Sequence, residues 1–202
     1  MRVAAIALAL GLSALGAAVP AQAEKLTAIF AGGCFWSVEY DFDRVAGVLS
    51  TTSGYIGGRT ASPTYYDHTS AGHREAVRVE YDSNRVDYDE LVKIFFRSVD
   101  PTDGGGQFCD RGHSYTTAVY AVGDEQLAIA GKAKAVAAKE LKKEIVTEVV
   151  PAPEFWPAED YHQDYYKKNP ARYKSYRSGC GRDASVDRVW GPQARYGINQ
   201  GS

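Results

Sequence analysis

The sequence is poor in sulfur. Its 202 residues include three cysteines and one methionine. Three cysteines are too few for a disulfide-rich scaffold, and they leave at least one thiol without a partner in the chain. The cysteines form no Cys-x-x-Cys pair, which disfavours a disulfide oxidoreductase that uses such a pair.

The chain also lacks an excess of charge and any repeat. It has 23 Lys and Arg against 25 Asp and Glu, a net charge of −2, so its charge gives no reason to expect binding to nucleic acid. Neither glycine nor any segment recurs at a fixed period, which excludes a collagen-like or repeat protein. An aromatic content of 12% disfavours disorder. We therefore expect one globular domain.

The N-terminus has the features of a secretory signal peptide. One arginine precedes an uncharged run rich in alanine and leucine over residues 3–19, and a small-x-small end follows at Ala23. The alternative is an uncleaved anchor helix, but the run is short and no Lys/Arg cluster flanks it. We predict a signal peptide over residues 1–23, a periplasmic or secreted product and no stable membrane anchor after cleavage. Cleavage also removes Met1, the only methionine.

Hydrophobic periodicity predicts the order of elements after the signal peptide. The expected strands cover residues 26–30, 48–55, 76–81, 115–122 and 146–150. The expected helices cover residues 34–43, 87–98, 124–144 and 158–168, and residues 101–113 form a long glycine-rich loop. Asp87 and Glu90 have capping-box spacing at the start of the second helix.

This order predicts an α+β two-layer sandwich, in which helices cover a mixed β-sheet with a ferredoxin-like core. An irregular C-terminal tail follows the sheet and helices. We assign residues 24–170 to this domain and residues 171–202 to the tail.

Cys34 is the first candidate for chemistry. It follows Gly32-Gly33 at the expected start of a helix, where unpaired N–H groups and the helix dipole favour an anion. We therefore expect a thiol pKa below the usual value of about 8.5. The alternative is a buried, inert cysteine at a strand-to-helix junction.

Several segments, which follow one another in the same order as in the family, resemble the peptide methionine sulfoxide reductases of the A class. They are AGGCFW (31–36), GYIGG (54–58), SPTY (62–65), GHREAV (72–77), DRGHSY (110–115), AEDYHQ (158–163) and KNP (168–170). The family reduces the S epimer of methionine sulfoxide, free or in proteins, and so repairs oxidised proteins. The resemblance implies that Cys34 is the nucleophile, which becomes a sulfenic acid as methionine leaves.

The resemblance also implies roles for residues around this cysteine. Glu75 matches a carboxyl with a raised pKa that protonates the sulfoxide oxygen. Tyr65 and Tyr115 match phenols that hydrogen-bond this oxygen, and Asp110 completes the cluster. Phe35 and Trp36 match the substrate-binding residues that surround the methyl group of the methionine sulfoxide. Each residue also has a structural alternative, because a glutamate at a strand start is usually solvated and most of the 14 tyrosines should serve packing.

Polar residues in and beside these segments could suggest a metal site. Their spacing fits no zinc pattern, so we expect no metal at His73, His113, Cys109 and Asp110. Tyr161 and His162 have packing against the sheet as their expected role, although the match to the family leaves room for substrate contact.

A second cysteine must return the sulfenic acid to the thiol through a disulfide. We expect Cys180 to resolve Cys34, because it lies between glycines in the tail. Cys109, next to Asp110, is the alternative resolving cysteine, a relay or a bystander. A further alternative is that Cys109 and Cys180 form a structural disulfide. We expect an external thioredoxin-like reductant, no bound cofactor, and a monomer that acts on oxidised proteins, peptides and free methionine sulfoxide.

Two other functions compete with this hypothesis. One is another exported thiol enzyme, a peroxidase, and the other is a non-catalytic binding module whose aromatic residues hold an apolar peptide. Turnover by a Cys34→Ser variant separates the binding module from an enzyme.

Overall fold

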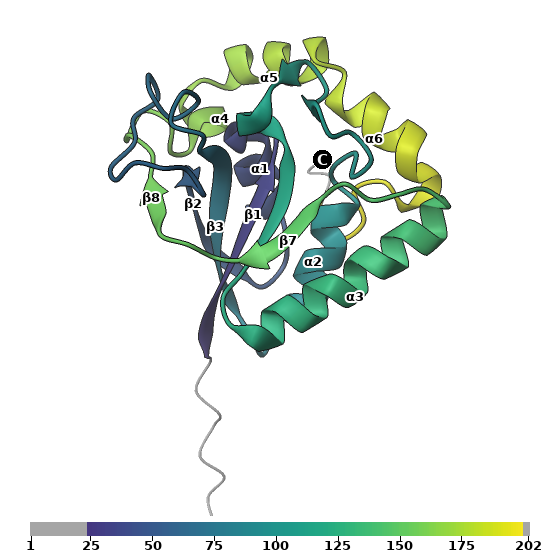
Figure 1. The fold of residues 1–202 in the computed structure, drawn as a ribbon. Coiled ribbons are helices and arrows are strands. Elements are labelled where there is room, and N and C mark those ends of the chain that lie inside the picture. Colours follow the sequence, from purple (N-terminus) through teal and green to yellow (C-terminus); the bar gives the residue numbers. More distant parts are fainter. Residues whose placement is uncertain (1–23, 200–202) are drawn as a thin grey trace, which may run out of the picture.

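The computed structural model describes residues 24–199, and the predicted signal peptide lies outside these residues. Figure 1 shows a sheet with helices packed against it, which confirms the predicted α+β fold. The core elements are β1 (Lys25–Gly32), α1 (Phe35–Phe42), β2 (Val48–Ile56), β3 (Arg74–Asp82), α2 (Tyr88–Phe96) and β6 (Thr117–Ala121). The sheet order β6-β1-β3-β2 with antiparallel neighbours is the ferredoxin-like arrangement.

Two short strands extend this core at its edges. β7 (Glu148–Pro151) pairs parallel with β6, and β8 (Phe155–Pro157) pairs antiparallel with β2. The one parallel pair makes the sheet mixed, as predicted. β8 was not predicted, because Pro153 shortly before it and Pro157 at its end disfavour a strand.

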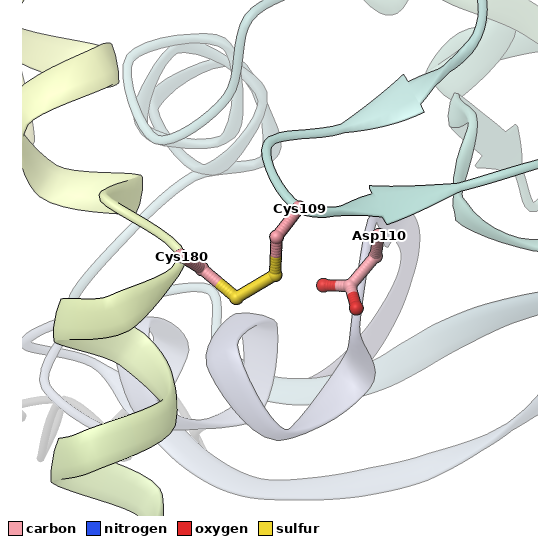
Figure 2. Close-up of side chains that lie close together, drawn as sticks. All are labelled: Cys109, Asp110 and Cys180. Atoms are coloured by element: carbon pink, nitrogen blue, oxygen red, sulfur yellow. A yellow bond between two sulfur atoms is a disulfide. The ribbon is translucent and has the colours of Figure 1, made fainter.

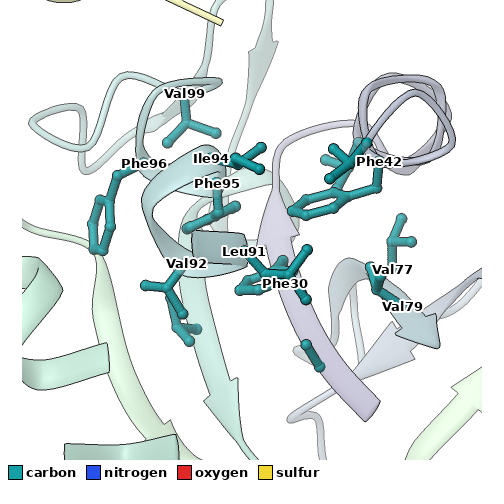
Figure 3. Packing of buried hydrophobic residues seen from close by; sticks show 14 of the residues in the cluster. Phe30, Phe42, Val77, Val79, Leu91, Val92, Ile94, Phe95, Phe96 and Val99 are labelled. Atoms are coloured by element: carbon teal, nitrogen blue, oxygen red, sulfur yellow. The ribbon is translucent and has the colours of Figure 1, made fainter. Parts of the chain in front are cut away.

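The main core lies between the sheet and helices α1 and α2 (Figure 3). The ring of Phe30 in β1 stacks 4.8 Å from that of Phe42 in α1 and 4.9 Å from that of Phe95 in α2. Leu91 is completely buried beside them. The long helix α3 (Asp124–Leu141) packs against α2 and completes this layer. Asp87 caps α2 by accepting the Glu90 N–H at 2.8 Å, as its spacing predicted.

Two sequence predictions, one for a helix and one for a loop, are wrong in detail. The expected helix over residues 158–168 is limited to α4 (Tyr165–Lys168), because the preceding turns bond side chains to backbone instead. The long loop contains a small hairpin of β4 (Gly106–Gln107) and β5 (Asp110–Arg111), followed by the 3₁₀ turn η1 (His113–Tyr115).

The predicted irregular tail is also wrong, because it forms helices α5 (Pro170–Gly179) and α6 (Arg182–Trp190) and the 3₁₀ turn η2 (Gly191–Gln193). Few apolar residues mark these helices, and buried arginines anchor them instead. Arg177 lies 2.8 Å from the buried carboxylate of Asp41 in α1. Figure 1 shows α5 crossing the end of the molecule where α1 begins. Within residues 24–199, no helix is both long enough and apolar enough to cross a membrane.

Candidate active site

Cys34 lies where β1 passes into α1, as the sequence predicted. It precedes the first residue of α1, and its carbonyl accepts the Ser37 N–H at 3.0 Å. Gly33 has a φ of 87°, and a Cβ there would lie 2.7 Å from the Gln107 side chain. Only glycine fits this turn, and it allows the β4–β5 hairpin to pack closely beside the cysteine.

The Cys34 thiol is buried, with 7% of its surface exposed. Burial raises its pKa well above the usual value, and the carboxylates of Glu75 and Asp110 raise it further. The Tyr176 hydroxyl and the backbone of Trp36 oppose this shift. The sequence predicted a lowered thiol pKa, and this prediction is wrong, because desolvation of the thiolate outweighs the dipole of the two-turn helix α1. Cys34 is a neutral thiol at neutral pH.

Glu75 comes from β3 and is almost completely buried. Its Oε2 accepts the backbone N–H of Phe35 at 2.9 Å, which fixes the carboxyl beside the start of α1. Burial raises its pKa to about 8, although the Phe35 N–H opposes the shift. His68 lies 3.8 Å away, but burial lowers its pKa and leaves its ring neutral. Glu75 is therefore mostly protonated at neutral pH, as the resemblance implied.

Tyr65 and Tyr115 lie in the same electrostatic surroundings. Burial raises the pKa of both phenols, and the ionised forms of Glu75 and Cys34 raise it further. Asp110 also acts on both tyrosines, and its own pKa is raised by burial. Tyr65 is 38% exposed and marks the rim of the site. The structure thus gathers all five predicted catalytic residues.

Tyr176 is a member of this group that the sequence analysis missed. Its hydroxyl donates a hydrogen bond to the Asp110 carboxylate, and it also acts on Cys34, whose thiol pKa it lowers. It projects from α5, in the segment that was expected to be irregular. Its spacing three residues after Tyr173 was the only signal, and 14 tyrosines in the chain made that signal weak.

Phe35 and Trp36 take different positions. Phe35 is 1% exposed and packs 5.8 Å from the ring of Tyr55, so it backs the site from the interior. Trp36 is half-buried, and its indole stacks on Tyr165 with centroids 3.7 Å apart. Of the two residues expected to contact substrate, Trp36 therefore presents more surface.

His162 joins the aromatic side chains. Its Nδ1 accepts the Trp36 Nε1–H at 3.0 Å, and burial lowers its pKa to about 4, so the ring is neutral with its proton on Nε2. Nε2 is buried and has no partner among residues 24–199. The rings of Phe35, Tyr65 and Tyr161 lie within 4.9 Å of the imidazole. His162 thus packs against Phe35, Trp36 and Tyr65 of the site, and not merely against the sheet.

Cys109 and Cys180 form a disulfide, with Cα atoms 5.0 Å apart, and Cys34 is free (Figure 2). Both sulfurs lie within 4.8 Å of an Asp110 carboxylate oxygen. Because they are shared in the disulfide, they are not available as thiolate ligands for a metal. Cys180 is the C-cap residue of α5, so it does not lie in an irregular tail as expected, while its resolving role stays a prediction.

The buried thiol and the neutral proton donors around it define a cysteine-dependent oxidoreductase of α+β fold. The family model described as peptide methionine sulfoxide reductase matches residues 26–194, and the chain belongs to this family. The predicted resemblance is therefore confirmed.

Individual relatives agree with this family. The chain is 57% identical over 182 residues to peptide methionine sulfoxide reductase MsrA 2 of Rhizobium meliloti, covering 90% of this chain and 92% of the relative. It is 51% identical to MsrA 2 of Caulobacter vibrioides, over 95% of this chain and all of the relative. Methionine sulfoxide reductase A of Corynebacterium diphtheriae superimposes with a TM-score of 0.70 at 35% identity, covering 75% of this chain and 78% of that one.

Proposed function

We propose that this protein reduces methionine S-sulfoxide, free or within polypeptides, to methionine, with Cys34 as the nucleophile. Membership of the family supports thiol-dependent reduction of methionine sulfoxide. The observation that carries the proposal is the burial of one free thiol beside Glu75, a carboxyl that stays protonated near neutral pH. The choice of the S epimer rests on the family alone.

The reaction transfers one oxygen atom from the substrate to the cysteine. Cys34 sulfur attacks the sulfoxide sulfur while Glu75 donates its proton to the sulfoxide oxygen. The oxygen then forms a bond to the Cys34 sulfur as its bond to the methionine sulfur breaks. The sulfur–sulfur bond made in the attack also breaks, so methionine leaves and Cys34 is left as a sulfenic acid. The Glu75 carboxylate regains its proton from the thiol, so the net change is thiol plus sulfoxide to sulfenic acid plus thioether.

Protonation of Glu75 removes one of the charges that hold the thiol proton in place. Its neutral carboxyl, with the phenols of Tyr65 and Tyr115, supplies donors where negative charge develops on oxygen. A site without a net positive charge also favours the neutral sulfoxide over an anionic substrate. We assign the methyl end of the substrate to the aromatic surface of Trp36, backed by Phe35.

The sulfenic acid needs two cysteines for recycling in this proposal. The Cys180 thiolate attacks the Cys34 sulfenic acid, releasing water and forming a disulfide. The Cys109 thiolate then attacks Cys180, which frees Cys34 and leaves the Cys109–Cys180 disulfide. That bond and the free Cys34 support this order. Cys109 is exposed, so a thioredoxin-like dithiol can reach it and return two electrons per turnover without a bound cofactor.

We also propose that the protein acts as a monomer outside the cytoplasm. The proposal rests on the signal-peptide pattern of residues 1–23 and requires a thioredoxin-like reductant in the periplasm or outside the cell. Sizing of the mature protein and N-terminal sequencing of an exported fraction test it. Recovery of uncleaved protein in the membrane fraction contradicts it.

A chiral assay tests the activity. We expect turnover of the S epimer of N-acetylmethionine sulfoxide with dithiothreitol as reductant, and none of the R epimer. Cys34→Ser should abolish turnover, with Ser37→Ala as the matched control near the start of α1. Consumption of hydrogen peroxide with no turnover of either sulfoxide would instead establish the competing peroxidase.

A further inference from the structure

Two exposed tyrosines lie beside the proposed sulfoxide site without a role in the reaction. Tyr66 is 91% exposed and Tyr161 is 51% exposed, although tyrosine carries a large apolar ring. Their neighbours connect them to the site. The Tyr65 ring is 6.3 Å from that of Tyr66 and 4.5 Å from that of His162, which in turn lies 4.2 Å from Tyr161.

The two segments that carry these rings are fixed to each other. The carboxylate of Glu159 accepts the Tyr65 N–H and the Tyr55 hydroxyl, each at 2.9 Å. The turn that contains Tyr66 is closed by Asp67, which accepts the Thr64 N–H. The rings therefore stand on a backbone that is in place before any ligand binds, which reduces the entropy cost of binding.

We propose that Tyr66 and Tyr161 form a tyrosine platform that binds apolar and aromatic side chains flanking the oxidised methionine of a polypeptide substrate. This proposal rests on the proposed function and names its preferred substrate class. The platform is continuous with Tyr65 at the rim of the site, so in this proposal the residues that flank a sulfoxide bound at Cys34 contact it. Stacking on an exposed ring buries apolar surface that neither partner buries alone.

Negative charge beside the platform also affects which substrate residues bind there. Asp67 follows Tyr66 and Asp160 precedes Tyr161, and both carboxylates are exposed. The Thr64 N–H lowers the pKa of Asp67, so this group is fully ionised at neutral pH. Acidic side chains next to the methionine are repelled here. The platform thus selects oxidised segments that are normally buried, which are rich in apolar and poor in acidic residues.

Peptides of equal length test the platform. The probes carry methionine S-sulfoxide flanked on both sides by phenylalanine, alanine or glutamate, and N-acetylmethionine S-sulfoxide has no flanking residues. We expect kcat/KM for the phenylalanine peptide to exceed that for the alanine peptide by about threefold to tenfold, the range expected for one or two aromatic contacts. The glutamate peptide should be the poorest.

Tyr66→Ala and Tyr161→Ala should each reduce the phenylalanine preference, while turnover of N-acetylmethionine S-sulfoxide stays unchanged. Tyr66→Phe should keep the preference, and Tyr196→Ala, which removes a tyrosine beside Lys93, is the matched control. An unchanged preference in both alanine variants, or an equal loss with the short substrate, overturns the platform. Failure of the wild type to turn over any sulfoxide refutes the proposed function itself, a separate result.

Discussion

The Tyr176 hydroxyl of α5 donates a hydrogen bond to the carboxylate of Asp110, 66 residues earlier in the chain. The same hydroxyl lowers the pKa of the Cys34 thiol, and Asp110 lies beside the Cys109–Cys180 disulfide. One phenol therefore links the proposed nucleophile to the cysteines that are proposed to recycle it.

We expect Tyr176→Phe to lower kcat by about tenfold to a hundredfold, because a hydrogen bond to a charged group contributes about 1.5–3 kcal/mol. The Tyr176 hydroxyl opposes the raised thiol pKa, so its removal should raise the Cys34 pKa further. The rate of Cys34 alkylation against pH measures this shift. Tyr166→Phe is the control, because its hydroxyl bonds Asp43 in another part of the molecule. Equal alkylation profiles for Tyr176→Phe and wild type would contradict the role.

Glu75→Gln should lower kcat by a factor of about 100 to 10,000, the range of general acid catalysis. Protonated Glu75 is the proposed active form, so wild-type activity should fall as pH rises through about 8. Glutamine cannot supply the proton at any pH, and the residual activity should lose this dependence. Steady-state rates with dithiothreitol, corrected for its own ionisation, give the profile. The same fall near pH 8 in the variant would assign it to another group.

Glu75 also predicts how stability depends on pH. Its folded pKa lies above the ordinary value of about 4.5, so its contribution to folding is fully present below pH 4.5 and is lost as pH rises through about 8. Glu75→Gln removes this loss. The variant should gain stability relative to wild type between pH 5 and pH 9, on the order of a few kcal/mol. Urea denaturation at both pH values measures the difference, and a constant difference contradicts the raised pKa.

Much of the fold follows from local sequence pattern. The spacing of Phe35, Val38 and Phe42 predicted the buried face of α1, and all three are at most 2% exposed. Cys34 was placed correctly because the diglycine and this helix are adjacent in sequence. Glu75 and the tyrosines were identified from the resemblance alone, since no local pattern distinguishes them from residues of the same type.

The rest depends on contacts between distant segments. Trp36 and His162 are 126 residues apart, and no periodicity predicts their hydrogen bond. The thiol pKa was wrong for the same reason: α5 and the β4–β5 hairpin bury Cys34, and their position could not be derived from residues near the cysteine. Helices α5 and α6 were missed because they contain few buried apolar residues, Tyr173, Val186 and Trp190, and because buried arginines supply the other contacts.

Peptide mapping after one equivalent of substrate tests the order of the cysteines. Reduced Cys180→Ser should stop at the Cys34 sulfenic acid, because no thiol attacks it. Reduced Cys109→Ser should accumulate a Cys34–Cys180 disulfide, and wild type should accumulate Cys109–Cys180. Each variant should complete one turnover without reductant. A dominant Cys34–Cys109 link in wild type would make Cys109 the resolving cysteine.

Substitution of Arg182 tests whether the C-terminal helices stabilise the turn that carries Cys34. Its buried guanidinium donates to the carbonyls of Gly32 and Ser98, each at 3.1 Å. Arg182→Met leaves both carbonyls without this donor and removes a charge near the buried Asp41, so we expect a loss of about 3–5 kcal/mol in the free energy of unfolding. Because Gly32 adjoins the turn that carries Cys34, kcat should also fall under conditions where the variant is folded. Arg188→Met, at an exposed position of α6, is the control and should change neither quantity. A variant as stable and as active as Arg188→Met would show that α6 is attached by its apolar residues alone.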